Sequence, residues 1–302
     1  MKFSVTILGS SAGVPTLSRS LPAQVVQFNE RLFLIDCGEG TQVQMQKFGI
    51  KPHRISHIFI SHLHGDHYLG LAGLLSSMNL QGRTQPLSLF APYSLAEVLT
   101  LQFRSMGVVL RFPLHFFPLP MEQPAVIFED DLLLVRCFPL VHLLPTVGFL
   151  FQEKPRERNL IKERLPEDMP FALLKALKRG ENVTWQDTFY HAEEVTLPPP
   201  LPRSYAYCSD TLYHEPLAKD LQGVNLLYHE ATFQEALADH ALKTTHSTAR
   251  QAAMLALKAQ AKKLIIGHFS ARYKDVSPLL TEARAVFLAT EAVEDGAVFE
   301  IA

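Results

Sequence analysis

Ser61-His62-Leu63-His64-Gly65-Asp66-His67 is the stretch that decides the fold expected for this chain. The preceding residues 54–60 are apolar and β-branched, which is typical of a buried strand. Residues 68–78 carry apolar side chains at helical spacing. Three histidines and one aspartate thus occupy a short turn between a strand and a helix. Neutral imidazoles and carboxylates are ligands that zinc and similar metals prefer, so the turn predicts a metal site.

The order of residues within the turn indicates more than one ion. His62 and His64 alternate along an extended chain, which directs both rings to one side. Gly65 lets the backbone turn, so that Asp66 and His67 can face a second ion nearby. The alternative is a polar loop that is rich in histidine without binding metal. Four ligand-type residues within six positions favour the metal site.

The composition is that of a globular protein with ample material for a core. The chain has 302 residues, of which 47% are hydrophobic and 19% charged. A net charge of -2 excludes a global basic field, so any RNA binding must come from a local patch. The three widely spaced cysteines are expected to be reduced and mostly buried. No apolar run reaches about 18 residues and the N-terminus reads as a strand, so we expect a cytoplasmic protein without a membrane span.

Further ligand-type residues follow other predicted strands. Strand-like runs lead to His142, Asp210, Glu230 and His268, and His229 precedes Glu230 directly. Because strands followed by helices stack into a sheet whose carboxyl ends share one edge, we expect these side chains to converge. The sequence therefore predicts an α/β protein in which each half of the chain contributes one sheet. Other strands are expected at residues 3–8, 23–28, 31–35, 87–91 and 125–128, and helices at 95–106 and from about Ser247.

Two features near the N-terminus leave alternatives open. Residues 9–16 form a loop of small residues after a strand, which could bring amides close to a phosphate or simply be a tight turn. Asp36 ends a strand, where it could hydrogen-bond a ligand histidine or cap a helix that begins near Thr41.

Residues 152–200 differ in character from the rest of the chain. Residues 154–164 contain five basic side chains, and the only acidic ones among them are Glu157 and Glu163. Pro198-Pro199-Pro200 ends the segment. Its polarity and its prolines indicate an insertion rather than part of a sheet core. Without other information, the segment could be a solvated helical excursion.

The motifs resemble those of a known family. His-x-His-x-Asp-His after a strand is the signature of the metallo-β-lactamase superfamily, and nearly the whole chain resembles ribonuclease Z, the endonuclease that trims the 3′ end of precursor tRNA. Pro145 and Gly148 after His142 resemble the family's third motif, and Thr245-His246-Ser247-Thr248 and Gly267–Tyr273 match others. The resemblance implies one αββα sandwich domain over residues 1–302, with residues 152–200 as a protruding arm.

The resemblance also implies a ligand set and roles for acids and bases. By this similarity His62, His64 and His142 hold one zinc, Asp66, His67 and His268 hold another, and Asp210 bridges them; manganese or another divalent ion is possible. Asp66 would also orient the attacking hydroxide and take its proton. His246 would donate a proton to the leaving 3′ oxygen, with Glu230 or His229 orienting it; the alternative places His246 at a helix N-terminus beside a Ser247 cap.

The partners implied are precursor tRNA, gripped by the arm, and a second copy of the chain in a homodimer. The family arm often carries Gly-Pro near its tip, where this chain has Met169-Pro170-Phe171-Ala172, so the resemblance does not carry over individual arm contacts. The main alternative function is a phosphodiesterase of the same fold that acts on small molecules such as cyclic nucleotides. A non-catalytic RNA-binding relative would have lost ligands, and none is missing here.

Overall fold

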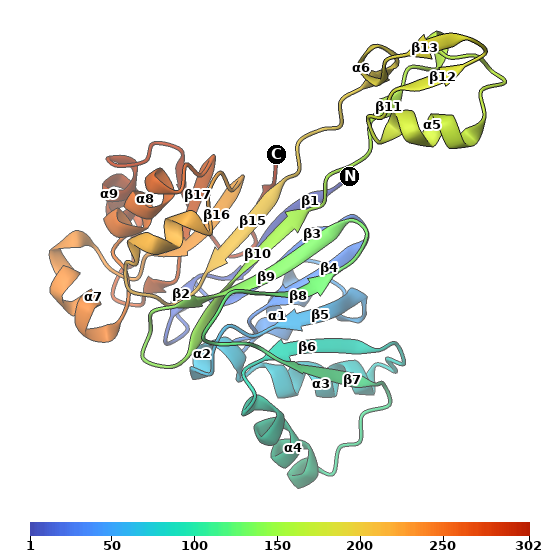
Figure 1. Cartoon of the computed structure of the whole chain (residues 1–302). Coiled ribbons are helices and arrows are strands. Elements are labelled where there is room, and N and C mark those ends of the chain that lie inside the picture. Colours follow the sequence, from blue (N-terminus) through green and yellow to red (C-terminus); the bar gives the residue numbers. More distant parts are fainter. The chain divides into compact units, whose positions relative to one another are not determined.

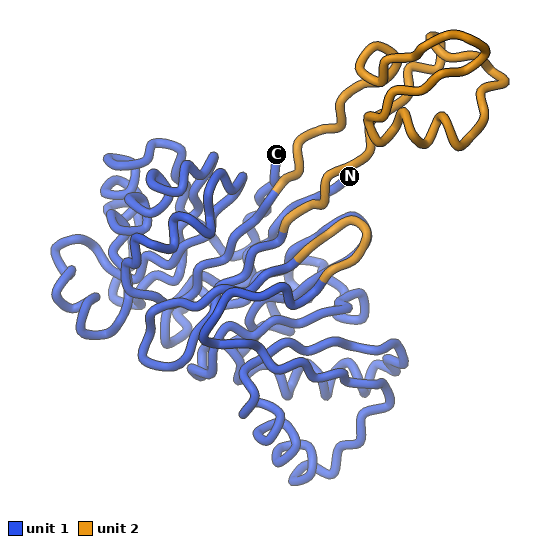
Figure 2. Tube along the Cα trace, viewed as in Figure 1, with its two compact units in different colours: residues 1–128, 135–151, 204–302 blue, residues 129–134, 152–203 orange.

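The computed structural model describes all 302 residues, and the chain divides into two compact units (Figure 2). Unit 1 comprises Met1–Phe128, Val135–Phe151 and Ser204–Ala302, whereas unit 2 comprises Glu129–Leu134 and Gln152–Arg203. Every residue of the predicted arm, 152–200, falls in unit 2. No helix of the protein has both the length and the apolar character needed to cross a bilayer.

The first sheet of unit 1 has seven strands in the order β20-β1-β3-β4-β5-β6-β7 (Figure 1). The pairs formed by β20, β1, β3 and β4 are antiparallel, and those from β4 to β7 are parallel. The strands are β1 Phe3–Gly9, β3 Ala23–Phe28, β4 Arg31–Ile35, β5 Ile55–Phe59, β6 Leu87–Ala91, β7 Leu114–Pro118 and β20 Val298–Glu300.

The second sheet also has seven strands, in the order β19-β17-β16-β15-β10-β9-β8. The strands are β8 Ala125–Glu129, β9 Leu133–Leu140, β10 Thr146–Glu153, β15 Ser204–Cys208, β16 Leu226–Glu230, β17 Lys263–Gly267 and β19 Thr290–Ala292. The four strands β15, β16, β17 and β19 are parallel. The prediction that each half of the chain supplies one sheet holds only in part, because β8, β9 and most of β10 come from the first half yet join the second sheet, and β20 from the C-terminal end joins the first.

The two sheets pack face to face through aromatic side chains. Phe33 of β4 and Phe59 of β5 contact Phe151 of β10, with ring centroids 5.7 and 5.5 Å apart. The alternate residues Leu34 and Ile58 point to the other face, into a buried cluster under three helices. Burial on both faces explains why these strands are apolar throughout.

Helices cover the outer faces and complete an αββα sandwich (Figure 1). The first sheet is covered by α1 Thr41–Lys47, α3 Leu71–Leu80 and α4 Leu95–Met106. The second sheet is contacted by α8 Ala249–Lys258 and α9 Ser277–Arg284. Alanines 252, 253 and 256 of α8 are fully buried, because small side chains let the helix lie close to the sheet. The remaining elements of unit 1 are the parallel pair β2 Ser11–Ala12 and β18 Phe269–Ser270, the helices α2 Gly65–Tyr68 and α7 Ala238–Thr244, and the 3₁₀ turns η1 Pro52–Arg54, η3 Glu215–Lys219 and η4 Glu235–Leu237.

Unit 2 has a small core of its own. Buried Met169, Leu177 and Val195 pack together with their neighbours. The unit contains the paired strands β11 Asn159–Leu160 with β14 Thr196–Leu197 and β12 Val183–Trp185 with β13 Thr188–Tyr190, the helices α5 Phe171–Lys178 and α6 Ala192–Val195, and the 3₁₀ turn η2 Lys162–Arg164. This core explains how a polar segment can hold a defined structure.

The structure adjusts the bounds of two expected helices. The helix predicted over residues 68–78 is divided into α2 and α3, where Gly70 N donates to the backbone oxygen of Cys37 at 3.0 Å. The helix expected from about Ser247 begins at Ala249. The three cysteines are free and buried, as predicted.

Candidate metal centre

The histidine turn follows β5 and packs tightly against the loop after β4. His62 precedes α2, and Asp66 and His67 lie in that helix, with both ring and carboxylate buried. Cys37 N donates to the backbone oxygen of His67 at 2.7 Å. A Cβ at Gly70 would lie 2.1 Å from the backbone oxygen of Gly38, so only glycine permits this contact. The close backbone packing fixes the direction of the ligand side chains.

A first cluster joins His62, His64 and His142. His64 Nδ1 lies 3.1 Å from both His62 Nε2 and His142 Nε2. Tetrahedral zinc with bonds of 2.0–2.1 Å to nitrogen places its ligand atoms about 3.3 Å from one another. Three imidazole nitrogens converging at this spacing fit a common metal ion.

A second cluster joins Asp66, His67 and His268. Asp66 Oδ2 lies 3.5 Å from the Nε2 atoms of both histidines, and these two nitrogens are 3.4 Å apart. The spacing again fits the ligand edge of a tetrahedral ion.

Asp210 lies between the two clusters. Its Oδ2 is 3.5 Å from His62 Nε2 and 3.7 Å from His142 Nε2. Its Oδ1 is 3.3 Å from His67 Nε2 and 3.2 Å from His268 Nε2, and this buried oxygen has no hydrogen-bond partner. A carboxylate that presents one oxygen to each cluster, with one of them unsatisfied, fits a bridge between two cations.

Charge supports the same fit. Burial lowers the pKa of His62, and it lowers the pKa of His142 to about 4 in spite of Asp210 nearby, so both rings are neutral as metal ligands must be. Burial also opposes ionisation of Asp210, but the surrounding histidines hold its pKa well below the usual range. The pKa of Asp66 is lowered in the same way, so two buried carboxylates are ionised in one centre, and divalent cations would stabilise their charge.

Asp36 orients ligands of both clusters. His67 Nδ1 and Tyr207 Oη each donate to Asp36 Oδ2 at 2.7 Å. Ser61 donates to the same carboxylate through its amide at 2.7 Å and its hydroxyl at 2.9 Å, and that hydroxyl lies 3.0 Å from His62 Nδ1. The predicted contact with a ligand histidine is confirmed. The cap alternative is wrong, because the N-cap of α1 is Gly40 and no side chain caps it.

Glu230 holds His246 beside the second cluster. His246 Nδ1 donates to Glu230 Oε1 at 2.8 Å, which leaves the opposite nitrogen of the ring available. The fully buried Glu230 also accepts the amides of Thr211 and Ser247 at 3.1 Å each. Burial alone would lower the pKa of His246, but the Glu230 carboxylate raises it to about 9. His229 instead donates from Nδ1 to the backbone oxygen of Glu230 and does not contact His246.

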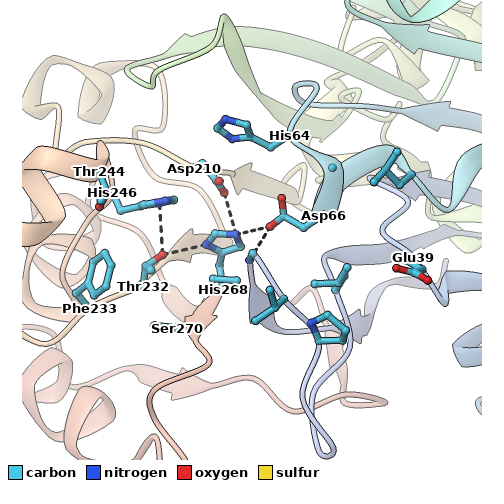
Figure 3. Close-up of a pocket in the computed structure, with 17 residues that line it drawn as sticks. Glu39, His64, Asp66, Asp210, Thr232, Phe233, Thr244, His246, His268 and Ser270 are labelled. Atoms are coloured by element: carbon cyan, nitrogen blue, oxygen red, sulfur yellow. Dashed lines mark hydrogen bonds and ion pairs between the residues drawn. The ribbon is translucent and has the colours of Figure 1, made fainter. Parts of the chain in front are cut away.

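Thr232 and Thr245 orient the remaining histidines. The Thr232 hydroxyl lies 2.9 Å from His268 Nδ1 (Figure 3). The same hydroxyl donates to Glu230 Oε2 at 2.7 Å. His142 Nδ1 donates to the backbone oxygen of Thr245 at 2.8 Å. Ser247 does not cap α8: its hydroxyl donates to Thr211, and Thr248 forms a capping box with Gln251.

Three non-glycine residues at the centre have left-handed backbones: Asp36 with φ 55°, Thr245 with φ 55° and His268 with φ 57°. Such conformations cost about 1–3 kcal/mol each and persist where the surrounding structure determines them. Each of the three either is a candidate metal ligand or contacts one, so part of the backbone strain of the chain lies where the ligands are oriented.

A cavity of about 580 Å³ opens onto this centre (Figure 3). Asp66, Asp210, His246 and His268 line it together with Glu39, Phe233 and the loop at residues 12–15. Within this loop the Gly13 amide is engaged, because it donates to Asp66 Oδ2 at 2.8 Å. The cavity can admit an extended phosphodiester to the two clusters.

The structure brings together all seven predicted metal ligands and both members of the Glu230–His246 pair. Sequence reasoning missed the roles of Ser61, Thr232, Thr245 and the Gly13 amide. Thr232 and Ser61 had a local signal, since Thr232 follows Glu230 by two positions and Ser61 directly precedes His62. Thr245 and the Gly13 amide act through contacts between segments distant in sequence.

The charges of unit 2 differ from the basic surface suggested by its sequence. Residues 152–203 contain as many acidic as basic side chains. Arg203 and Arg156 both pair with buried Glu153 at 2.7 and 2.8 Å, and further pairs engage Lys154, Lys178 and Arg179. Lys162 and Lys175 are exposed outside these pairs. The free positive charge of the unit is therefore small.

Proteins of known sequence match this chain over almost its full length. Ribonuclease Z of Bacteroides fragilis is 44% identical over 288 residues, which is 95% of each chain. Ribonuclease Z of Cytophaga hutchinsonii is 44% identical over 303 residues, covering 100% of this chain and 97% of the relative. The chain belongs to the ribonuclease Z family.

Solved structures agree with this membership. The human tRNase Z short form (ELAC1) matches with a TM-score of 0.73 and 26% identity, covering 99% of both chains. The metallo-β-lactamase fold protein YhfI of Bacillus subtilis matches with a TM-score of 0.70 over 99% of this chain, but at 17% identity it shows the fold alone. A family model described as anti-Pycsar protein Apyc1 matches residues 3–108, which form most of the first sheet and its helices. Ribonuclease Z family membership rests on the full-length relatives.

Proposed function

We propose that this member of the ribonuclease Z family is a metal-dependent endoribonuclease that removes the 3′ trailer from precursor tRNA. It leaves a 3′-OH on the tRNA and a 5′-phosphate on the trailer. The observation that carries the proposal is the position of Asp210, whose two oxygens face separate clusters beside the Glu230–His246 pair. Two cation sites next to a proton donor are what hydrolysis of a phosphodiester requires.

Two zinc ions per subunit, or another divalent pair such as manganese, suit the residues present. His62, His64 and His142 would hold one ion, and Asp66, His67 and His268 the other, with Asp210 shared between them. Such ions supply positive charge for the phosphate and make water acidic enough to lose a proton near neutral pH.

Asp66 takes the proton of the attacking water. Burial opposes ionisation of Asp66, but His67 and His268 hold the pKa of its carboxyl far below the usual range, so it is ionised. The Gly13 amide fixes one of its oxygens, which keeps the carboxylate directed into the cavity. A base held in this way needs no reorganisation when the substrate arrives.

His246 donates a proton to the leaving 3′ oxygen of the tRNA. Its Nδ1 is bound to Glu230, so the proton comes from Nε2, and His246 is one of the residues that line the cavity. Glu230 raises the pKa of His246 and so favours the protonated ring, whereas nearby cations would lower that pKa. Protonation is needed because an alkoxide is a poor leaving group.

Unit 2 supplies a binding surface for tRNA. Its folded core supports a separate binding element at residues 152–200, inserted in a single catalytic domain. Lys162 and Lys175 are the side chains best placed to contact phosphates, since neither is committed to an ion pair. We further propose a cytoplasmic homodimer, on family grounds.

The test is incubation of the purified protein with a 3′-extended precursor tRNA, with and without a chelator. We expect cleavage that the chelator abolishes and zinc restores, with a 5′-phosphate on the released trailer. A 2′,3′-cyclic phosphate would rule out the mechanism. A parallel reaction with a cyclic nucleotide separates the alternative: hydrolysis of that compound without cleavage of precursor tRNA would make the protein a small-molecule phosphodiesterase.

A further inference from the structure

Asp295, in the turn before β20, binds both ends of the loop at residues 10–20, which lies far from it in sequence. Ser10 Oγ donates to Asp295 Oδ1 at 2.7 Å, and Ser20 N donates to Asp295 Oδ2 at 2.7 Å. Gln44 Nε2 donates to the same Oδ2 at 2.9 Å. Since Ser10 and Ser20 are the two ends of one loop, the carboxylate holds the loop from both sides.

That loop supports two ligands of the second cluster. Gly13 N donates to Asp66 Oδ2 at 2.8 Å. The backbone oxygen of Ser10 accepts from Phe269 N at 2.8 Å, directly after His268, and Ser11 and Ala12 pair with β18 in parallel. His268 has a left-handed backbone, so its direction depends on how the following residue is held.

The first cluster is held by other contacts. His62 Nδ1 lies 3.0 Å from the Ser61 hydroxyl, and His142 Nδ1 donates to Thr245. Neither contact involves residues 10–20. A disturbance of the loop should therefore reach one cluster and not the other.

We propose that Asp295 is a positioning residue that holds the loop at residues 10–20 and thereby orients Asp66 and His268 for one of the two metal ions. The inference rests on the proposal that these two residues and His67 bind an ion. Removing a group that supports metal ligands weakens metal binding by about 10- to 100-fold. We expect that loss for the second ion only.

The experiment titrates metal-free full-length protein with zinc against a chromophoric competing chelator. The wild type should bind two ions, and fewer than two would refute the two-ion proposal itself. In Asp295→Ala, one ion should bind about 10- to 100-fold more weakly while the other is unchanged. The neighbouring exposed Glu294→Ala is the matched control and should bind both ions as the wild type does.

Two further variants identify which ion binds more weakly in Asp295→Ala and why. His268→Ala should retain one ion, and adding Asp295→Ala to it should leave the affinity of that ion unchanged. Asp295→Asn should bind both ions nearly normally, because its amide oxygen can accept from Ser20 and Gln44 while its nitrogen donates to the Ser10 hydroxyl.

Equal weakening of both ions in Asp295→Ala would overturn the proposal, as would unchanged binding of both. A loss in Asp295→Asn as large as in Asp295→Ala would show that charge, not the hydrogen-bonded loop, is responsible, and would also overturn it. If Asp295→Ala does not fold, Ser10→Ala removes one of the three bonds and should weaken the same ion to a smaller extent.

Discussion

Replacing Thr232 by valine tests whether one hydroxyl couples the second cluster to the acid. Valine keeps the shape of the buried side chain but removes the acceptor 2.9 Å from His268 Nδ1 and the donor 2.7 Å from Glu230 Oε2. Glu230 retains the amide of Thr232 at 3.0 Å. His268 is left with a buried, unsatisfied N–H.

The magnitude follows from these contacts. An unsatisfied buried donor costs about 1–3 kcal/mol, and a lost hydrogen bond to a charged group costs about 1.5–3 kcal/mol. Because both bonds share one hydroxyl, we expect a combined loss of about 3 kcal/mol in the free energy of unfolding of the metal-free protein. The affinity for one metal ion should fall about 10- to 100-fold.

Urea unfolding of the metal-free protein and zinc titration measure the two effects. Thr232→Ser is the control, since serine retains the hydroxyl and should retain both stability and metal affinity. Wild-type metal affinity in Thr232→Val would refute the reasoning, because it would mean that His268 needs no acceptor at Nδ1.

The remaining predictions concern the acid, the carboxylate at Asp36, unit 2 and the metals. His246→Ala should retain both ions and lose about 10²- to 10⁴-fold in kcat on precursor tRNA, and loss of zinc measured by elemental analysis would contradict its role. Asp36→Asn should weaken both ions about 10- to 100-fold in a chelator competition, because Asp36 reaches one cluster directly and the other through Ser61. Lys162→Ala and Lys175→Ala should each raise KM for precursor tRNA without changing hydrolysis of a small phosphodiester. Each should also lower by about one the magnitude of the slope of log tRNA affinity against log salt concentration. Treatment with a chelator should abolish cleavage, and an activity that survives complete metal removal would contradict the two-ion mechanism.

Many strands and the candidate ligands could be predicted because both depend on local patterns. Apolar runs bounded by turn residues gave the strands at 23–28, 31–35 and 87–91 with correct bounds. The ligands follow strands, and the carboxyl ends of neighbouring strands meet at one edge, so their convergence was expected. The strand β10 was missed because its sequence runs without a break into the polar segment after Gln152.

In unit 2, the basic residues in the sequence do not predict the charge of the surface. The run from Lys154 to Arg164 indicates a basic surface, yet partners such as Glu153, Glu157 and Glu129 neutralise neighbouring cations. An ion pair forms only where folding brings two side chains within a few ångströms, and that distance is not encoded by spacing along the chain.

Sequence alone therefore predicted the α/β class and the candidate metal-binding side chains, since apolar runs and metal preference are properties of residues and their neighbours, whereas the αββα sandwich was implied by the family resemblance. Tertiary structure decided how those side chains are held. The hydroxyl of Thr232, the amide of Gly13 and the carboxylates of Asp36 and Asp295 act through hydrogen bonds, which need a donor and an acceptor at the right distance and angle. Their partners lie up to 285 positions away, and only the packed chain sets that geometry.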